Sequence, residues 1–418
     1  MSDLIIHQLP ADIEQRRDPY PWLDRLRRSG PVQRVELRGG GHAWMVTRYD
    51  DVMAAIAHPS LSSDPRTPGS AASLSARPGG DGRRPPSMLT TDPPDHTRLR
   101  QLVSRAFTPR RVASLRPRVQ QIADALIDEV APLGRADLVA DFALPLPVAV
   151  ICELLGVPFE DRGQFGRWST DMLSPPVAPA AAAAAEQARA DLGGYLAGLV
   201  ARKRAEPADD LLTALAAAGE ENRLSDAELV GTAVLLLVAG HETTVSLIGT
   251  GTLLLLLHPG QLNRLRREPA LLPSAVEEFL RYDGPVMLGV VRYAREDLDL
   301  AGTAVAAGET VVLSTGAANR DPGRFDRPDV LDIARAHNPH LALGQGLHYC
   351  LGAALARLEG QIAIGTLLRR LPALALAVDE EAVRRRPSVI RGLATLPVTF
   401  TPTALPADRD DRPHVAGR

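Results

Sequence analysis

The strongest chemical signal in this sequence is a single cysteine that follows a glycine-rich turn. Residues 343–352 read Leu-Gly-Gln-Gly-Leu-His-Tyr-Cys-Leu-Gly, and an apolar, alanine-rich stretch runs on from Cys350 to about Arg369. The glycines at 344 and 346 allow a tight turn and leave room for a flat ligand against the backbone. Cys350 is predicted to lie in the first turn of a helix over this stretch, where free N–H groups and the helix dipole favour its thiolate. We therefore predict that Cys350 is the thiolate ligand of an iron centre.

A buried structural thiol is the ordinary alternative, because lone cysteines commonly lie in the core. The spacing Gly-x-Gly-x-His-x-Cys-x-Gly makes that interpretation the weaker one. The other cysteine, Cys152, lies in the apolar run Val148–Leu155 and is predicted to be such a core residue. Two cysteines also exclude a disulfide framework.

A second polar group interrupts the long apolar helix predicted at Asp226–Leu257, whose middle reads Ala-Gly-His-Glu-Thr-Thr over residues 239–244. Gly240 weakens a helix relative to alanine, and the hydroxyls of Thr243 and Thr244 can bond to a carbonyl one turn earlier. Such a cluster is usually a tolerated kink. The functional alternative is a local opening of the helix that seats dioxygen and a water molecule.

The polar side chains of this cluster favour proton delivery. Cleavage of an O–O bond consumes two protons, which the carboxyl group of Glu242 and the hydroxyl of Thr243 could relay. A zinc-protease motif, His-Glu-x-x-His, is excluded because residue 245 is valine. His241 is therefore predicted to be a surface or packing residue.

Together these motifs resemble those of the bacterial soluble cytochrome P450 family. The cysteine loop resembles the family's haem-thiolate loop, although Leu343 stands where the family usually has phenylalanine. Residues 239–244 match the family pattern A-G-x-[D/E]-T-[T/S] in full. The resemblance covers roughly residues 15–400. It implies a mainly α fold with small β-sheets, in one triangular, helix-rich domain with an N-terminal β-rich part.

The resemblance also implies one haem b, with Cys350 as the ligand of its iron. Two basic residues on one predicted helix face, one strand arginine and one histidine of the cysteine loop would bind the haem propionates; they are His96, Arg100, Arg292 and His348. The remaining cofactor-binding candidates lie in the cysteine loop and the long helix, and they are Gly344, Gly352, Ala239 and Gly240.

A third motif lies on the helix predicted at Ser274–Tyr282, where Glu278 and Arg281 stand on one face. Such a pair is ordinarily solvated and worth about 0.3 kcal/mol. Here it matches the family's E-x-x-R, which implies a structural role in holding the haem-binding fold together. Arg335 is the predicted third partner, with Arg324 as the alternative.

The implied reaction is NAD(P)H-driven insertion of one oxygen atom from O2, by hydroxylation or epoxidation, into an organic molecule. Ferredoxin and a ferredoxin reductase are the expected electron donors. A basic surface for an acidic ferredoxin could be formed by Arg105, Arg110, Arg111 and Arg357, although ordinary solvated arginines are an equal alternative.

Two other functions stay open: peroxide-driven or oxidative-coupling chemistry on the same haem, and a non-catalytic haem-binding sensor or scaffold. The latter would not need Glu242 and Thr243.

The substrate is expected to be a mainly hydrophobic small molecule. The candidate pocket residues are nearly all apolar, and they are Met88, Leu89, Val238, Val286, Met287 and Leu288. Each could equally be core. The Ala-, Arg- and Pro-rich composition resembles that of actinobacterial enzymes that modify secondary metabolites such as polyketides. Two proline-rich connections, Ser62–Pro94 and Ser174–Pro179, are expected to act as a mobile lid and as an entrance gate.

Composition agrees with an intracellular enzyme. A length of 418 residues allows several average domains, but a single domain over 1–418 is equally compatible, with an ordered core of about residues 15–403 and a frayed tail at 404–418. A net charge of −3 and 4% aromatic residues do not favour a nucleic-acid partner. Residues 1–22 resemble neither a signal peptide nor a membrane anchor. We expect a soluble, cytoplasmic monomer.

Residue patterning predicts mostly helices. A β-hairpin is expected at Val32–Leu37 and Ala43–Val46, with further strands after Pro285. Besides those already named, the predicted helices are Tyr49–His58, His96–Phe107, Arg110–Ala131, Leu144–Leu155, Phe159–Met172, Ala180–Arg204, Ala208–Ala218 and Gly260–Arg267.

Overall fold

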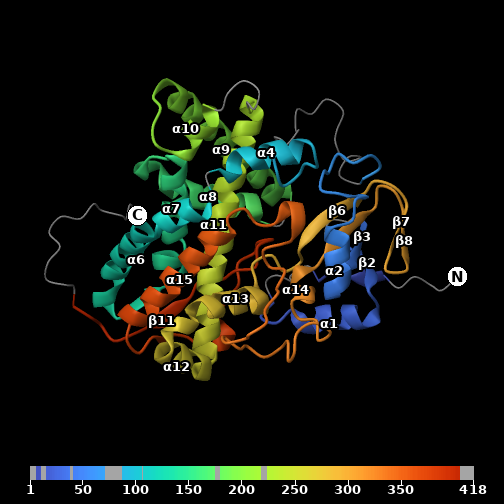
Figure 1. Ribbon diagram of the computed structural model, residues 1–418. Coiled ribbons are helices and arrows are strands. Elements are labelled where there is room, and N and C mark those ends of the chain that lie inside the picture. The colour runs from blue at the N-terminus through green and yellow to red at the C-terminus, as the bar shows by residue number, and fades with distance from the viewer. Residues whose placement is uncertain are drawn as a thin grey trace.

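The computed structural model describes residues 6–10, 16–37, 41–70, 87–105, 107–174, 179–217 and 224–404. A large helical part is joined to a smaller part rich in β-strands (Figure 1). The helices are α1 (Tyr20–Ser29), α2 (Tyr49–Ile56), α4 (Asp95–Ser104), α5 (Pro109–Ser114), α6 (Arg116–Val130), α7 (Pro145–Leu155), α8 (Arg162–Leu173), α9 (Pro179–Ala205), α10 (Leu211–Ala216), α11 (Asp226–Leu257), α12 (Pro259–Arg267), α13 (Leu272–Asp283), α14 (Thr315–Ala318) and α15 (Ala353–Arg370). The expected mainly α fold with small β-sheets is confirmed.

The β-rich part is built on a six-stranded mixed sheet with the order β1-β2-β3-β9-β6-β4. Its strands are β1 (Ile6–Gln8), β2 (Val32–Glu36), β3 (His42–Val46), β4 (Leu61–Ser62), β6 (Val290–Ala294) and β9 (Thr310–Leu313). The predicted hairpin is confirmed as β2 and β3, which pair antiparallel. Smaller sheets contain β5 (Arg135–Asp137), β10 (Ala375–Leu376) and β11 (Pro397–Thr399), and β7 (Leu298–Leu300) and β8 (Thr303–Val305).

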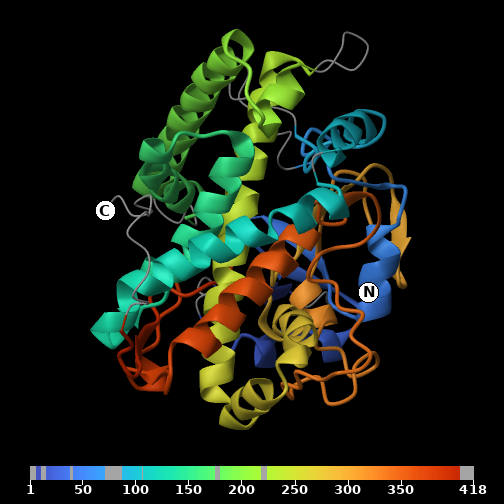
Figure 2. The ribbon, with the colours of Figure 1, turned by 60° about the vertical axis from the view of Figure 1, so that its left-hand side comes forward.

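Helix α11 runs lengthwise through the helical part, with α15 and α7 packed beside it (Figures 1 and 2). A capping box fixes its start, because Ser225 Oγ accepts the Glu228 N–H while the Glu228 carboxylate accepts the Ser225 N–H. The helix is long and apolar enough to cross a membrane, but 67% of its most apolar window is buried inside the protein. It is therefore the central core helix that positions residues 239–244.

Some predicted boundaries were wrong for identifiable reasons. Helix α1 was not predicted, because its ten residues are short and rich in charge. The single helix predicted at Arg110–Ala131 is divided into α5 and α6 next to Pro117, which has no N–H for a continuous ladder. Parts of the predicted lid (71–86) and gate (175–178), and the tail from residue 405, lie outside the described residues.

Candidate active site

The cysteine loop closes on itself just before α15. The Cys350 N–H donates to the Leu343 carbonyl at 2.8 Å. Gly344 and Gly346 have φ angles of +71° and +65°, a backbone region that favours glycine. The helix begins at Ala353, so the prediction that Cys350 lies in its first turn was wrong. The turn of residues 350–352 instead presents the cysteine ahead of the helix.

The protein alone does not hold Cys350 as a thiolate. Burial raises the pKa of its thiol, and the Gly352 N–H and the charges of Arg100 and Arg357 only partly oppose this effect. The Gly352 N–H favours the thiolate, as expected for free N–H groups ahead of a helix, but burial outweighs this effect, and a bound metal cation would favour the thiolate further. Among the described residues no three His, Cys, Asp or Glu side chains could share a metal ion. A metal at Cys350 would therefore bring most of its ligands with it, as a porphyrin does.

Basic side chains predicted from separate motifs meet beside this loop. The rings of His96 and His348 lie 4.4 Å apart between centroids. Both ring nitrogens of His96 are buried, with no hydrogen-bond partner among the described residues. Arg292, on β6, is buried as well, and the hydrogen bond described for it goes to the neighbouring Val291 carbonyl at 2.9 Å. Arg100 donates to the Tyr349 carbonyl at 2.6 Å, which ties α4 to the cysteine loop.

The electrostatics of this basic cluster fit an anionic ligand. Burial and the nearby charges of Arg292 and His96 lower the pKa of His348 to about 4. Burial and Arg100 likewise lower the pKa of His96. The neighbouring carboxylate of Asp92 is already held by two serines and an arginine. Asp92 opposes the positive charge of the cluster only in part, and the two carboxylates of haem would add further negative charge.

Helix α11 contributes a second wall. Ala239 is exposed although most of the helix around it is buried, so a flat ligand can approach there. Thr243 Oγ1 donates to the Ala239 carbonyl at 3.0 Å, and the helix is continuous through residues 239–244. The expected local opening is therefore not observed. A Cβ on Gly240 would come within 2.9 Å of Ile151, so this glycine lets α7 pack closely.

Glu242 is buried within a polar network that the sequence did not reveal. It forms an ion pair with Arg386, and His241 Nε2 lies 3.5 Å from its carboxylate. Burial alone would raise the pKa of Glu242, but His241, Arg386 and Ser169 lower it to about 2. Arg386 lies 144 residues further along the chain, and no local pattern links it to Glu242.

His241 is not a surface residue, so that part of its prediction was wrong. Its side chain is fully buried and it bridges two helices. Nε2 lies 2.9 Å from Ser169 Oγ on α8, and Nδ1 lies 2.7 Å from the Leu237 carbonyl. The polar network of Ser169, His241, Glu242 and Arg386 therefore connects α8, α11 and the C-terminal segment.

Glu278 and Arg281 are both fully buried and joined by two hydrogen bonds of 2.8 Å. Arg335 reaches Glu278 at 3.1 Å, whereas Arg324 lies over the Tyr49 ring. Arg281 also donates to carbonyls of residues 319 and 328. The triad thus fastens α13 to the segment that leads to the cysteine loop.

The candidate substrate residues do not share one environment. Met287 is 1% exposed and packs with α1 and the large sheet, and Met88 packs in the core beside Leu99. Burial favours the core-packing alternative for both residues. Leu89 is exposed, while Val238, Val286 and Leu288 are half-buried.

Comparison with known proteins agrees with this geometry. The Cytochrome P450 family model matches residues 180–389. "Cytochrome P450 107B1" of Saccharopolyspora erythraea is 49% identical over 378 residues, covering 89% of this chain and 92% of that protein. The "6-deoxyerythronolide B hydroxylase" of the same organism is 46% identical, covering 91% and 96%. The solved structure of the bacillaene polyketide synthase cytochrome P450 PksS from Bacillus subtilis has a TM-score of 0.85 at 40% identity, covering 93% of this chain and 99% of that one.

A mainly helical fold with a cysteine loop beside a central helix is typical of haem-thiolate proteins. The sequence comparisons and the structural comparison both agree with this class. The chain belongs to the cytochrome P450 family. It is a cytochrome P450 monooxygenase, and its family implies a haem cofactor.

Proposed function

We propose that this monooxygenase hydroxylates or epoxidises a mainly hydrophobic secondary metabolite, such as a polyketide intermediate. The observation that carries the proposal is the apolar character of the candidate residues that stay accessible. Ala239 of α11 and Leu89 are exposed, and Val238, Val286 and Leu288 are half-buried. Two similar proteins are named for 6-deoxyerythronolide B hydroxylation and for a polyketide synthase system, which supports this substrate class.

Haem ligated by Cys350 would supply the activation of dioxygen. The proposed propionate partners are the four basic side chains that meet beside the cysteine loop, namely His96, Arg100, Arg292 and His348. The main chain of Gly344 and Gly352 would hold one face of the ring and Ala239 the other, whereas Gly240 faces Ile151 of α7.

The proposed proton path uses Thr243 and Glu242. Thr243 Oγ1 holds a proton on the exposed side of α11, and Glu242 renews the supply from the interior. Because Arg386 and His241 hold the Glu242 carboxylate, this ion pair must open during each transfer. These two residues favour an oxygenase over a haem-binding sensor, which needs no proton supply.

The proposed electron donor is an acidic ferredoxin in the cytoplasm. Leu347 of the cysteine loop is 59% exposed. Arg105 is exposed directly after α4, and Arg110 is exposed on α5, which packs against α15. Arg357 is less suited than the sequence suggested, because it donates two hydrogen bonds to Glu277 at 2.7 and 2.8 Å. We therefore assign docking to Arg105, Arg110 and Arg111.

The substrate class is tested by titrating the haem-loaded protein with matched compounds. Macrolactones, terpenoids, aromatic acids and peptides would be added separately while the Soret band is followed. A polyketide macrolactone should displace the water ligand of the iron and shift the band at micromolar concentration. Turnover under ¹⁸O₂ should then yield a product with one labelled oxygen atom. A shift given only by a charged peptide would contradict the proposal.

A further inference from the structure

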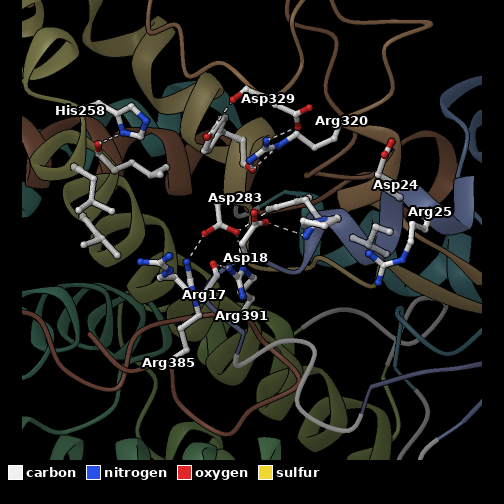
Figure 3. Close-up of a pocket in the computed structure, with 18 of the residues that line it drawn as sticks. Arg17, Asp18, Asp24, Arg25, His258, Asp283, Arg320, Asp329, Arg385 and Arg391 are labelled. Carbon is white, nitrogen blue, oxygen red and sulfur yellow. Dashed lines mark hydrogen bonds and ion pairs between the residues drawn. The ribbon is translucent and has the colours of Figure 1, made fainter. Parts of the chain in front are cut away.

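A cavity of about 650 Å³ lies between α1, the ends of α11 and α13, and residues 380–391 (Figure 3). None of the residues assigned above to haem or to proton delivery lines it. Leu253, one of its lining residues, follows Thr243 by ten residues on α11, which is roughly 15 Å along the helix. The cavity is therefore separate from the candidate active site.

A buried carboxylate stands at the centre of this cavity (Figure 3). Asp283 accepts hydrogen bonds from Tyr20 Oη at 3.0 Å, from Arg391 Nε at 2.6 Å and from Arg385 Nη2 at 2.5 Å. Burial would raise the pKa of Asp283, but Arg385 and Arg391 hold it well below its usual range. Asp283 is therefore ionised and contributes one negative charge.

More positive than negative charge is buried around Asp283 in the described part of the cavity wall. The guanidinium groups of Arg320, Arg385 and Arg391 are all buried there. Arg320 pairs with Asp329, whose side chain is 77% exposed and is therefore strongly screened by water. The Arg385 side chain is only 7% exposed, and its Nη1 has no hydrogen-bond partner among the described residues. A buried guanidinium N–H without an acceptor is costly, so an anion would be favoured there.

We propose that this cavity binds the carboxylate of a small organic acid through Arg385. A guanidinium group matches an oxyanion in two parallel hydrogen bonds, and Arg385 uses one of its terminal nitrogens for Asp283 while the other remains available. Leu253, Leu254 and Leu257 form an apolar wall beside the charged groups. This wall favours an acid with a short apolar chain over inorganic phosphate, which shares the same oxyanion chemistry.

The haem-loaded full-length protein would be titrated calorimetrically with sodium hexanoate, sodium phosphate and sodium chloride at equal ionic strength. Hexanoate should bind saturably, phosphate more weakly and chloride not at all. Arg385→Gln should weaken hexanoate binding by about 10-fold or more, whereas Arg385→Lys should retain part of it. The matched control is Arg370→Gln, which removes an arginine paired with Asp128 on α6 and should leave the affinity unchanged.

Asp283→Asn provides an opposite test, because it removes the carboxylate that competes for Arg385. This variant should unfold at a lower temperature than the wild type but regain more of its stability when hexanoate is added. Phosphate binding equal to that of hexanoate would assign the site to oxyanions in general. No saturable binding of either anion to the wild type up to about 10 mM, or equal binding by Arg385→Gln, would overturn the proposal.

Discussion

Individual residues of the site are governed by burial more than by their local sequence. The Cys350 thiol has a raised pKa, and the His348 imidazole has a lowered one, because burial disfavours the charged form of each. Both groups are therefore neutral in the protein alone. A cofactor that brings a metal cation to Cys350 and carboxylates to the basic cluster would offset the effect of burial on the charged forms of both groups.

Cys350→Ser should abolish the haem-thiolate spectrum. The wild-type protein, reduced under carbon monoxide, should show the strongly red-shifted Soret band of thiolate-ligated haem, because only the cysteine supplies a thiolate there. Absorbance spectra of both proteins check this, with circular dichroism to establish that the variant is folded. Cys152→Ala is the matched control, because Cys152 is buried in the core and its removal should leave the band in place. A wild-type spectrum like that of a histidine-ligated globin would refute the assignment.

Thr243→Ala should uncouple electron consumption from product formation. Haem binding, substrate binding and reduction need no proton relay, so they should stay nearly intact. NAD(P)H should still be consumed, but with more hydrogen peroxide and about 10-fold less product per NAD(P)H, which corresponds to about 1.4 kcal/mol. The measurement compares product, peroxide and NAD(P)H in the same reaction. Thr244→Ala is the matched control, because Thr244 is buried and bonds back to the Gly240 carbonyl in the same way. Equal losses in both variants would contradict a specific role for Thr243.

At the scale of elements, α11 is held by contacts from distant parts of the chain. Ser246 Oγ donates to the Arg391 carbonyl, and Arg386 pairs with Glu242, so the C-terminal segment is fastened along the helix. The same segment donates from the Val389 N–H to the Leu173 carbonyl at the end of α8. A change in the C-terminal segment should therefore affect Glu242 on the proposed proton path.

The ion pair between Glu242 and Arg386 should make stability depend on pH in a defined window. The pKa of Glu242 is lowered to about 2 in the folded protein, so its contribution is fully present above about 4.5 and is lost as the pH falls toward 2. The limiting contribution of all the groups that lower this pKa, with His241 ahead of Arg386 and Ser169, is about 3 kcal/mol, and the Arg386 share is smaller. Arg386→Gln should therefore be less stable than the wild type at pH 6, and the difference should shrink between pH 5 and pH 3. Urea unfolding at each pH measures it.

Arg17→Gln serves as the control for that measurement. Arg17 forms exposed ion pairs with Glu380 and Glu381 in the same C-terminal region, and such pairs contribute little to stability. Its unfolding free energy should follow the wild-type curve at every pH. A difference between wild type and Arg386→Gln that stays constant from pH 6 to pH 3 would show that Arg386 acts by packing alone.

Local spacing predicted contacts between residues close together in the chain, whereas distant partners such as His348 for His96 and Arg335 for Glu278 were predicted only through the family resemblance. The hairpin of β2 and β3 and the pairing of Glu278 with Arg281 follow from short spacings. Arg386 could not be predicted, because its partner is defined only once the C-terminal segment packs on α11. For Met287, sequence spacing did not decide between the substrate pocket and the core cluster in which the structure places it.

At the scale of the whole molecule, the proposed ferredoxin surface and the proposed proton path lie on different elements. The cysteine loop brings Leu347 to the surface beside α4 and α5, whereas Thr243 and Glu242 lie on the central helix. α4 and α12 lie at opposite ends of the molecule in both views (Figures 1 and 2). This separation allows the docking surface to be tested by charge reversals at two distant places.

The double variant Arg105→Glu, Arg110→Glu should slow ferredoxin-supported reduction by roughly 10-fold or more at low ionic strength. Charged surfaces steer association, and this steering is screened as salt shortens the Debye length from about 30 Å at 0.01 M to about 3 Å at 1 M. The defect should therefore shrink as salt is added, and reduction by dithionite should be unaffected. Stopped-flow absorbance with each electron source measures both rates. The matched control reverses Arg266 and Arg267, which are exposed on α12, and it should reduce at the wild-type rate. Equal slowing with dithionite would indicate damage to the haem site, and equal slowing in the α12 variant would indicate a general effect of net charge, so either result would exclude docking at Arg105 and Arg110.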